Sequence, residues 1–341
     1  ILIKIISGHI LGYNPVYGTT LNFNCSDWFF FDVFGQSLPI AEDGSFYYET
    51  NLMIPGDATL RVGRKSFEIF LVPGGELEIT FNLPEIYWSE SRLFGKKDRR
   101  PLVWFEGTYA GLNTELTKYA GLTSIYSADN FYENICGVTP AQYKKYVTKI
   151  YEKNRDEILK NKLLSDAART YMINNLEMSY FFAIKGYKGT ISYAPMISGK
   201  KGVKRADMTV GENYYDDILR LDFIHSPYIR YGGYPDFVRA ATEDFKGKFE
   251  PQPIWEDILR AKPLGSILAR LKPLSEKQML TLDSISEPEI KKALTIRNQK
   301  VMDLLAESAK KTGYTICQLD TAVTADSLLA VITRPYRGKV V

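Results

Sequence analysis

The spacing of hydrophobic residues changes once along this chain, within residues 103–113. Before this segment, apolar residues alternate with polar ones, which is the period of β-strands. After it, apolar residues recur every three or four positions, which is the period of α-helices. Gly107 and Gly111 flank the change, and no long linker separates the two parts. The sequence therefore predicts an α+β fold, in which an N-terminal antiparallel β-sandwich is followed directly by an irregular α-helical bundle.

The N-terminal part, residues 1–106, is predicted to be a β-sandwich domain of short strands. Its clearest alternation places Leu77 and Ile79 on one face of a strand and Glu78 on the other,. Glycine-containing turns separate such segments, which is typical of sandwiches. Strands are expected at residues 3–11, 20–24, 28–34, 45–52, 58–62, 66–72, 76–81 and 102–105. The charged segment 84–101 is predicted to be a solvent-exposed segment that precedes the last strand.

Residues 107–322 are predicted to form the helical domain. A capping box is present where Thr139 is followed three residues later by Gln142, with proline at the first helical position between them,. Further helices are expected over residues 165–185 and after two similar starts at residues 275–278 and 286–289. We expect about six to eight helices, packed as an irregular bundle.

Two segments depart from the helical pattern. Residues 186–211 contain several glycines, a proline and five basic residues, and we predict a long loop or small insertion there,. Residues 323–341 are predicted to form a short helix, over residues 326–333, and then a linker. The linker ends in Lys339-Val-Val, which is typical of a buried strand at its start, and this favours a continuation of the chain into a further domain.

Composition excludes several classes of function. The 43 basic and 40 acidic residues give a net charge of +3, which does not favour nucleic acid as a partner,. The three cysteines lie too far apart in the sequence to form a metal-ligand pair. Two histidines are few for a histidine-based catalytic triad or a metal site with several histidine ligands. We therefore expect no catalytic residue, no metal and no cofactor. The three cysteines are Cys25, Cys136 and Cys317, and the two histidines are His9 and His225.

No hydrophobic run is long enough to span a membrane, and the N-terminus lacks a signal-peptide cleavage pattern,. A cytosolic location and an already processed, exported form both remain open on these residues alone. Carboxylates are abundant, so a hydrolase that uses a pair of them is a further hypothesis, although no residue is singled out.

The most suggestive candidate contact surface is a loop rich in tyrosine. It contains Tyr228, Arg230, Tyr231 and Tyr234, separated by two glycines. Such side chains are suited to contact a peptide, a glycan or a partner protein. The alternative interpretation, which we favour, is a connection between helices whose tyrosines pack into the bundle.

Four short segments resemble the N-terminal region of Bacteroidetes envelope proteins of the TlpA/ResA type. They are Asp-Gly-Ser-Phe at 43–46, Phe-Leu-Val-Pro-Gly-Gly-Glu-Leu at 70–77, Phe-Glu-Gly-Thr-Tyr-Ala-Gly-Leu-Asn at 105–113, and Tyr-Arg-Gly-Lys-Val-Val at 336–341. The resemblance implies a β-sandwich and a helical segment that precede a thioredoxin-like domain. In that family the strand that begins like residues 336–341 continues into a Trp-Cys-x-x-Cys active site, which this sequence does not reach.

The resemblance thus implies an accessory, scaffolding region of a cell-envelope thiol–disulfide oxidoreductase. We expect an exported protein in the periplasm or on the outer membrane, joined to the membrane only through a lipid anchor outside this chain. The expected partners are another protein or the chain's own thioredoxin-like domain; a peptide, a glycan and a second copy of the chain are further candidates. The alternative is a non-enzymatic envelope lipoprotein that binds peptide or glycan through its tyrosine-rich loops.

Overall fold

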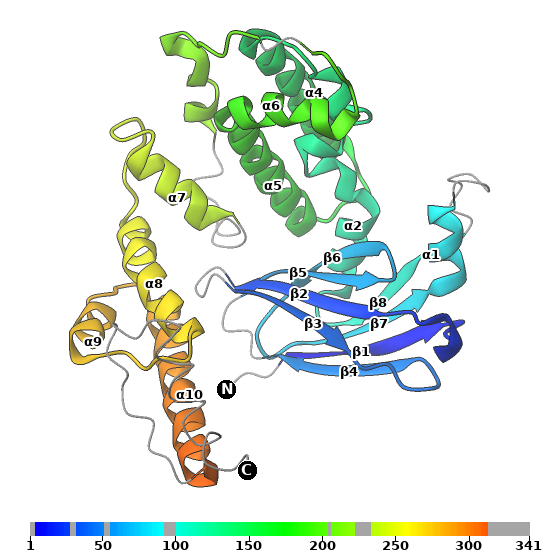
Figure 1. Ribbon diagram of the computed structural model, residues 1–341, viewed down its shortest axis with the longest axis vertical. Helices are drawn as coiled ribbons and strands as arrows, with labels where there is room; N and C mark the ends of the chain where they lie inside the picture. The colour runs from blue at the N-terminus through cyan, green and yellow to red at the C-terminus, as the bar shows by residue number, and fades with distance from the viewer. Residues whose placement is uncertain are drawn as a thin grey trace, which may run out of the picture.

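The computed structural model describes residues 4–27, 32–50, 55–91, 100–203, 206–221 and 233–312. It confirms the predicted α+β class: eight strands in two sheets are followed by a series of helices (Figure 1). The predicted short helix at 326–333, the linker after it and the expected strand residues 28–31 lie outside the described residues. The division into domains at residues 106 and 322 stays a prediction.

The N-terminal strands form two four-stranded sheets. One sheet has the order β4-β1-β7-β8 and the other β3-β2-β5-β6. The first comprises β1 (Lys4–Leu11), β4 (Ser45–Thr50), β7 (Glu76–Asn82) and β8 (Val103–Gly107). The second comprises β2 (Leu21–Asp27), β3 (Asp32–Leu38), β5 (Gly56–Val62) and β6 (Lys65–Leu71). Their inner faces share one core, to which Phe23, Leu60, Phe67, Ile79 and Phe81 contribute.

One strand pair is parallel, so the expectation of a wholly antiparallel sandwich is wrong there. Strand β1 runs parallel to β7, with Ile6 opposite Leu77 and Gly8 opposite Ile79. Alternation identifies strands but is the same for both directions, so direction could not be read from it. The two strands approach closely at Gly8, where an added Cβ would lie 1.8 Å from the backbone oxygen of Ile79. Only glycine fits at this position without moving the backbone.

Residues after β8 form nine α-helices within the described ranges, rather than six to eight. They are α2 (Ala110–Tyr119), α3 (Phe131–Asn134), α4 (Pro140–Lys160), α5 (Asp166–Lys185), α6 (Tyr187–Ser198), α7 (Tyr234–Glu243), α8 (Pro253–Ala269), α9 (Glu276–Asp283) and α10 (Pro288–Thr312). Short 3₁₀ segments connect several of them: η2 (Ala120–Leu122), η3 (Ile125–Ser127), η4 (Glu212–Tyr215) and η5 (Ile218–Arg220). Another, η1 (Pro15–Tyr17), lies in the sandwich. The capping box at Thr139 and Gln142 is confirmed.

Two predicted irregular segments contain helices instead. Residues 84–101 were expected to be solvated, but α1 (Leu83–Glu90) begins this stretch and buries Leu83 and Ile86. Two core residues in eight give too weak a periodic signal to be read. Residues 186–211 begin with α6, which includes Pro195 and buries Tyr187, Ile191 and Ala194. The spacing of these three is helical, and their burial outweighs the cost of the glycine and proline within the helix.

The helices form two groups around the sandwich. Helix α2 packs on β6 and β8, and α4 lies along α5, with α6 across them (Figure 1). From there α7 leads to α8, which packs against α9 and α10. A single continuous hydrophobic core runs through both groups, and it includes Phe70 of β6. The sandwich and the helices are therefore joined by shared packing as well as by the chain.

Candidate functional site

The junction between the sandwich and the helices, which we call the seam, is built from residues 70, 107–113 and their neighbours. Gly107 ends β8 with a φ of 88°, and an added Cβ would lie 2.6 Å from the backbone oxygen of Glu76. The same oxygen accepts a hydrogen bond of 2.7 Å from the backbone N–H of Thr108. Tyr109 is also left-handed, at φ 61°, and α2 begins directly after it. Two unusual backbone conformations thus turn the chain sharply from sheet to helix.

Asn113 ties α2 to the edge strand β6. Its side-chain oxygen accepts the backbone N–H of Phe70 at 2.6 Å, and its amide donates to the Phe70 oxygen at 3.1 Å. The amide also donates to the Tyr109 oxygen at 3.1 Å. Asn113 is fully buried, so these bonds satisfy backbone groups that water does not reach. The side chain pairs with β6 as a neighbouring strand would, and closes its edge.

A second polar contact in the seam joins β5 to α5. The Tyr171 hydroxyl donates a hydrogen bond to the carboxylate of Asp57. Burial raises the pKa of Asp57 to about 6, although the Tyr171 bond opposes the shift and nearby Glu68 adds to it. Burial and the Asp57 carboxylate raise the pKa of Tyr171 well above its usual value. The phenol therefore remains a donor, and Asp57 is the group here that titrates near neutral pH.

A polar pocket of about 270 Å³ lies between α4, α5 and η5. Its polar lining residues are Tyr151, Glu152, Arg155, Asp156, Glu177 and Arg220. Lys144 of α4 holds the η5 segment in place, since it donates to the Tyr214 oxygen at 2.7 Å and pairs with Asp217 at 2.9 Å. These contacts join α4 to the residues that precede Arg220, and so help to position Arg220 at the pocket.

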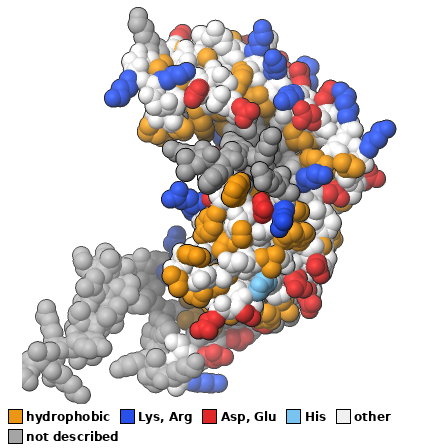
Figure 2. All heavy atoms as spheres, turned by 90° about the vertical axis from the view of Figure 1, so that its right-hand side faces the viewer, with side chains coloured by type: hydrophobic (Ala, Val, Ile, Leu, Met, Phe, Trp, Pro, Cys, Tyr) orange, Lys and Arg blue, Asp and Glu red, His pale blue; other side chains and the backbone are white. Residues whose placement is uncertain are grey.

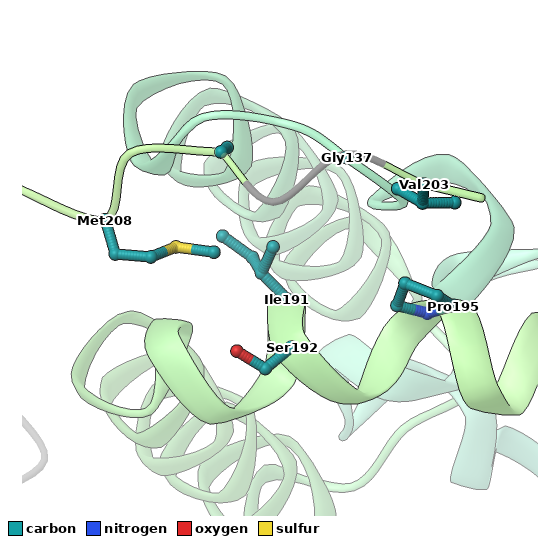
Figure 3. Close-up of a pocket in the computed structure, with 7 residues that line it drawn as sticks. Gly137, Ile191, Ser192, Pro195, Val203 and Met208 are labelled. Atoms are coloured by element: carbon teal, nitrogen blue, oxygen red, sulfur yellow. The ribbon is translucent and has the colours of Figure 1, made fainter.

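Two other pockets are mainly apolar. One, of about 330 Å³, lies beside α6; Figure 3 shows Ile191 and Met208 facing each other across it, with Pro195 and Val203 at its other end. The second, of about 520 Å³, is an open groove between α9 and α10, lined by Leu274, Glu276, Met279, Leu280, Asn298 and Met302.

The sandwich exposes several large aromatic side chains. On the face that includes α1, hydrophobic side chains lie at the surface over the strands and α1 (Figure 2). The exposed aromatic residues of the sandwich half include Tyr47, Tyr87, Trp88 and Trp104. Exposed tryptophan and tyrosine are enriched where proteins contact partners, so these side chains are candidates for protein contact.

The tyrosine-rich loop predicted from sequence is only partly described. Tyr228, Arg230 and Tyr231 lie outside the described residues, so their role stays a prediction. Tyr234 is the first residue of α7 and is 2% exposed. Its hydroxyl accepts a hydrogen bond from the Trp255 indole at 2.9 Å. At this position the alternative interpretation, a tyrosine packed into the bundle, fits the structure better.

Two of the three cysteines and one of the two histidines lie within the described residues. Cys25 is buried in the sandwich core. Cys136 lies next to α3, and its sulfur is 3.0 Å from the Ser198 hydroxyl. His9 is a half-buried residue of β1. Cys317 and His225 lie outside the described residues.

Sequence reasoning did not identify the residues that the structure brings together at the seam and the polar pocket. Asn113 offered one usable signal, because it lies beside Leu112 and near Leu116 on a helix face that should be apolar. A polar side chain at such a position needs a buried hydrogen-bond partner. Arg155 and Arg220 offered none, since they are 65 positions apart and meet only in the folded chain.

Within the described ranges, none of the helices has the length and apolar character that crossing a membrane requires. Those same ranges hold no group of three or more His, Cys, Asp and Glu side chains placed to bind a metal ion. No family model matches the chain, and no curated protein or solved structure is detectably similar to it.

Proposed function

We propose that this chain is the non-catalytic accessory region of an exported thiol–disulfide oxidoreductase of the TlpA/ResA type. In this proposal it positions a thioredoxin-like domain, or binds that domain's client. One observation carries the proposal furthest: two of the segments that resemble the family, residues 70–77 and 105–113, are the segments that build the seam. A third, residues 43–46, forms the tight turn before β4, where Asp43 accepts the backbone N–H of Ser45 at 2.9 Å.

An accessory region of this kind acts by holding other parts at fixed positions. Its usefulness depends on a stiff connection between its own halves, because proximity and orientation are lost when a scaffold flexes. The three hydrogen bonds of Asn113, the aromatic contacts of Phe70 with Tyr109 and Tyr171, and the shared core supply such a connection. The motif residues thus have a structural role that suits a platform.

The exposed aromatic residues of the sandwich suit the same role. Trp88 of α1 and Trp104 of β8 provide apolar surface of the kind that protein partners cover,. The family resemblance implies that this partner is the chain's own redox domain or that domain's client. Export to the periplasm or outer membrane, with a lipid anchor outside this chain, belongs to the proposal on the same ground.

The test combines cell fractionation with thiol counting on the native, full-length protein. We expect the protein in the envelope fraction, with more cysteines than the three in this sequence. Two of the additional cysteines should react with a maleimide only after reduction, as a Cys-x-x-Cys disulfide does. Recovery in the cytosolic fraction, or no cysteines beyond Cys25, Cys136 and Cys317, would overturn the proposal.

A further inference from the structure

The polar pocket between α4, α5 and η5 has two cationic side chains with unused hydrogen-bonding capacity. Arg155 and Arg220 both line it. Neither guanidinium makes an ion pair or a side-chain hydrogen bond with another described residue. A guanidinium carries five N–H donors in a planar fork, and that fork matches the two oxygens of a carboxylate. Two such groups at one small pocket form a site suited to an anionic group.

The same pocket has a buried acidic wall. Glu177 of α5 is 6% exposed and lines the cavity. The Tyr151 hydroxyl donates to its carboxylate at 3.3 Å. The Tyr151 ring stacks on Tyr180 with the ring centroids 4.5 Å apart, and the Tyr180 hydroxyl lies 2.7 Å from that of Thr148. Stacking and hydrogen bonding therefore hold Tyr151 and Glu177 in fixed positions, and the acidic wall is already ordered before any ligand binds.

Two further carboxylates stand at the exposed rim of the pocket. Glu152 and Asp156 both line it, and Asp156 also pairs with Lys160 at 2.6 Å. Bonding to Lys160 lowers the pKa of Asp156, so it is negative at neutral pH. Together with Glu177 these groups would repel a dianion such as phosphate, while the two arginines would repel a simple cation. The distribution of charge favours a ligand that carries both signs.

We propose that this pocket binds a small zwitterion, with its carboxylate at Arg155 and Arg220 and its ammonium group at the acidic side chains. Its volume of about 270 Å³ is just below the range of drug-sized sites, about 300–1,000 Å³, and suits a ligand of amino-acid or dipeptide size. A free amino acid and a short peptide share this chemistry, and the experiment separates them.

The experiment measures binding to the full chain by isothermal titration calorimetry. L-Alanine, L-leucine and dialanine serve as zwitterionic probes. N-acetyl-L-alanine removes the ammonium group, L-alanine amide removes the carboxylate, and acetate and inorganic phosphate carry negative charge alone. We expect at least one zwitterion to bind, and each ligand that lacks one charge to bind about tenfold more weakly or worse. Tighter binding of the amino acids than of dialanine indicates a free amino acid as the ligand; the reverse indicates a peptide.

Variants assign that binding to the pocket. Arg155→Gln and Arg220→Gln should each weaken it about tenfold or more. Lys153→Gln is the matched control, since Lys153 lies on the same helix, is exposed and pairs only loosely with Glu157 at 3.8 Å. It should leave binding unchanged, and circular dichroism checks that each variant is folded. The proposal is overturned if no zwitterion binds, if acetate or phosphate binds as tightly, or if the arginine variants bind like the original chain.

Discussion

Replacing Asn113 by alanine should weaken the connection between sandwich and helices more than any other single change in the seam. Asn113→Ala removes three hydrogen bonds from a fully buried position. The backbone N–H and oxygen of Phe70 then lose these partners in a place that water does not reach. Each buried polar group that loses its partner costs about 1–3 kcal/mol, so the two together predict a loss of about 2–6 kcal/mol in the free energy of unfolding.

Urea unfolding followed by circular dichroism measures this loss. Hydrogen exchange with mass spectrometry locates it, and peptides from β6 and α2 should lose protection before those from the centre of the sandwich. Thr114→Ala is the matched control, because Thr114 is the next residue and bonds only within its own helix, to the Ala110 oxygen at 2.9 Å. A loss of less than about 0.5 kcal/mol in Asn113→Ala would refute the role given to Asn113, since that is the usual effect of a surface change.

Three further predictions follow from single positions. Burial raises the pKa of Asp57 from 3.8 to about 6, so the folded chain binds this proton more tightly and its stability falls as pH rises between these two values, by up to about 3 kcal/mol. Asp57→Asn should remove that slope in urea titrations from pH 4 to 7.5, and an unchanged slope would assign it to other groups. Gly107→Ala should destabilise the chain by about 1–3 kcal/mol, because φ is 88° and the new Cβ meets the Glu76 oxygen; a thermal midpoint equal to that of the original chain would contradict this. Thr139→Ala should cost about 1 kcal/mol through loss of the cap on α4, while an exposed change in mid-helix, such as Lys153→Ala, should cost much less.

Strands and helices are predictable from the sequence where one face of the segment is buried and the other is exposed to solvent. Strand β7 alternates cleanly and was expected within one residue of its observed end, and α4 was expected from its capping box at Thr139. Strand direction was not predictable, because alternation is identical in parallel and antiparallel pairs. Helix α6 is not predictable in this way, because Gly189 and Pro195 are typical of loops, while the helical spacing of its buried residues is short.

The candidate sites were less predictable than the elements, because they depend on contacts between distant residues. Asn113 was recognised as part of a motif, but its partner Phe70 is 43 positions away and is contacted through its backbone. The pocket of Arg155 and Arg220 exists only because α4 and η5 meet in the folded chain. The residue type and sequence context of Tyr234 favour a contact surface, yet the start of α7 places this side chain in the core.

The central claim, that this chain is the accessory region of a thiol–disulfide oxidoreductase, is tested most directly by reading the coding sequence that follows the codon of Val341. We predict that this coding sequence leads into a Trp-Cys-x-x-Cys motif within a thioredoxin-like domain. A stop codon at that point, or a continuation without two cysteines in this spacing, would contradict it.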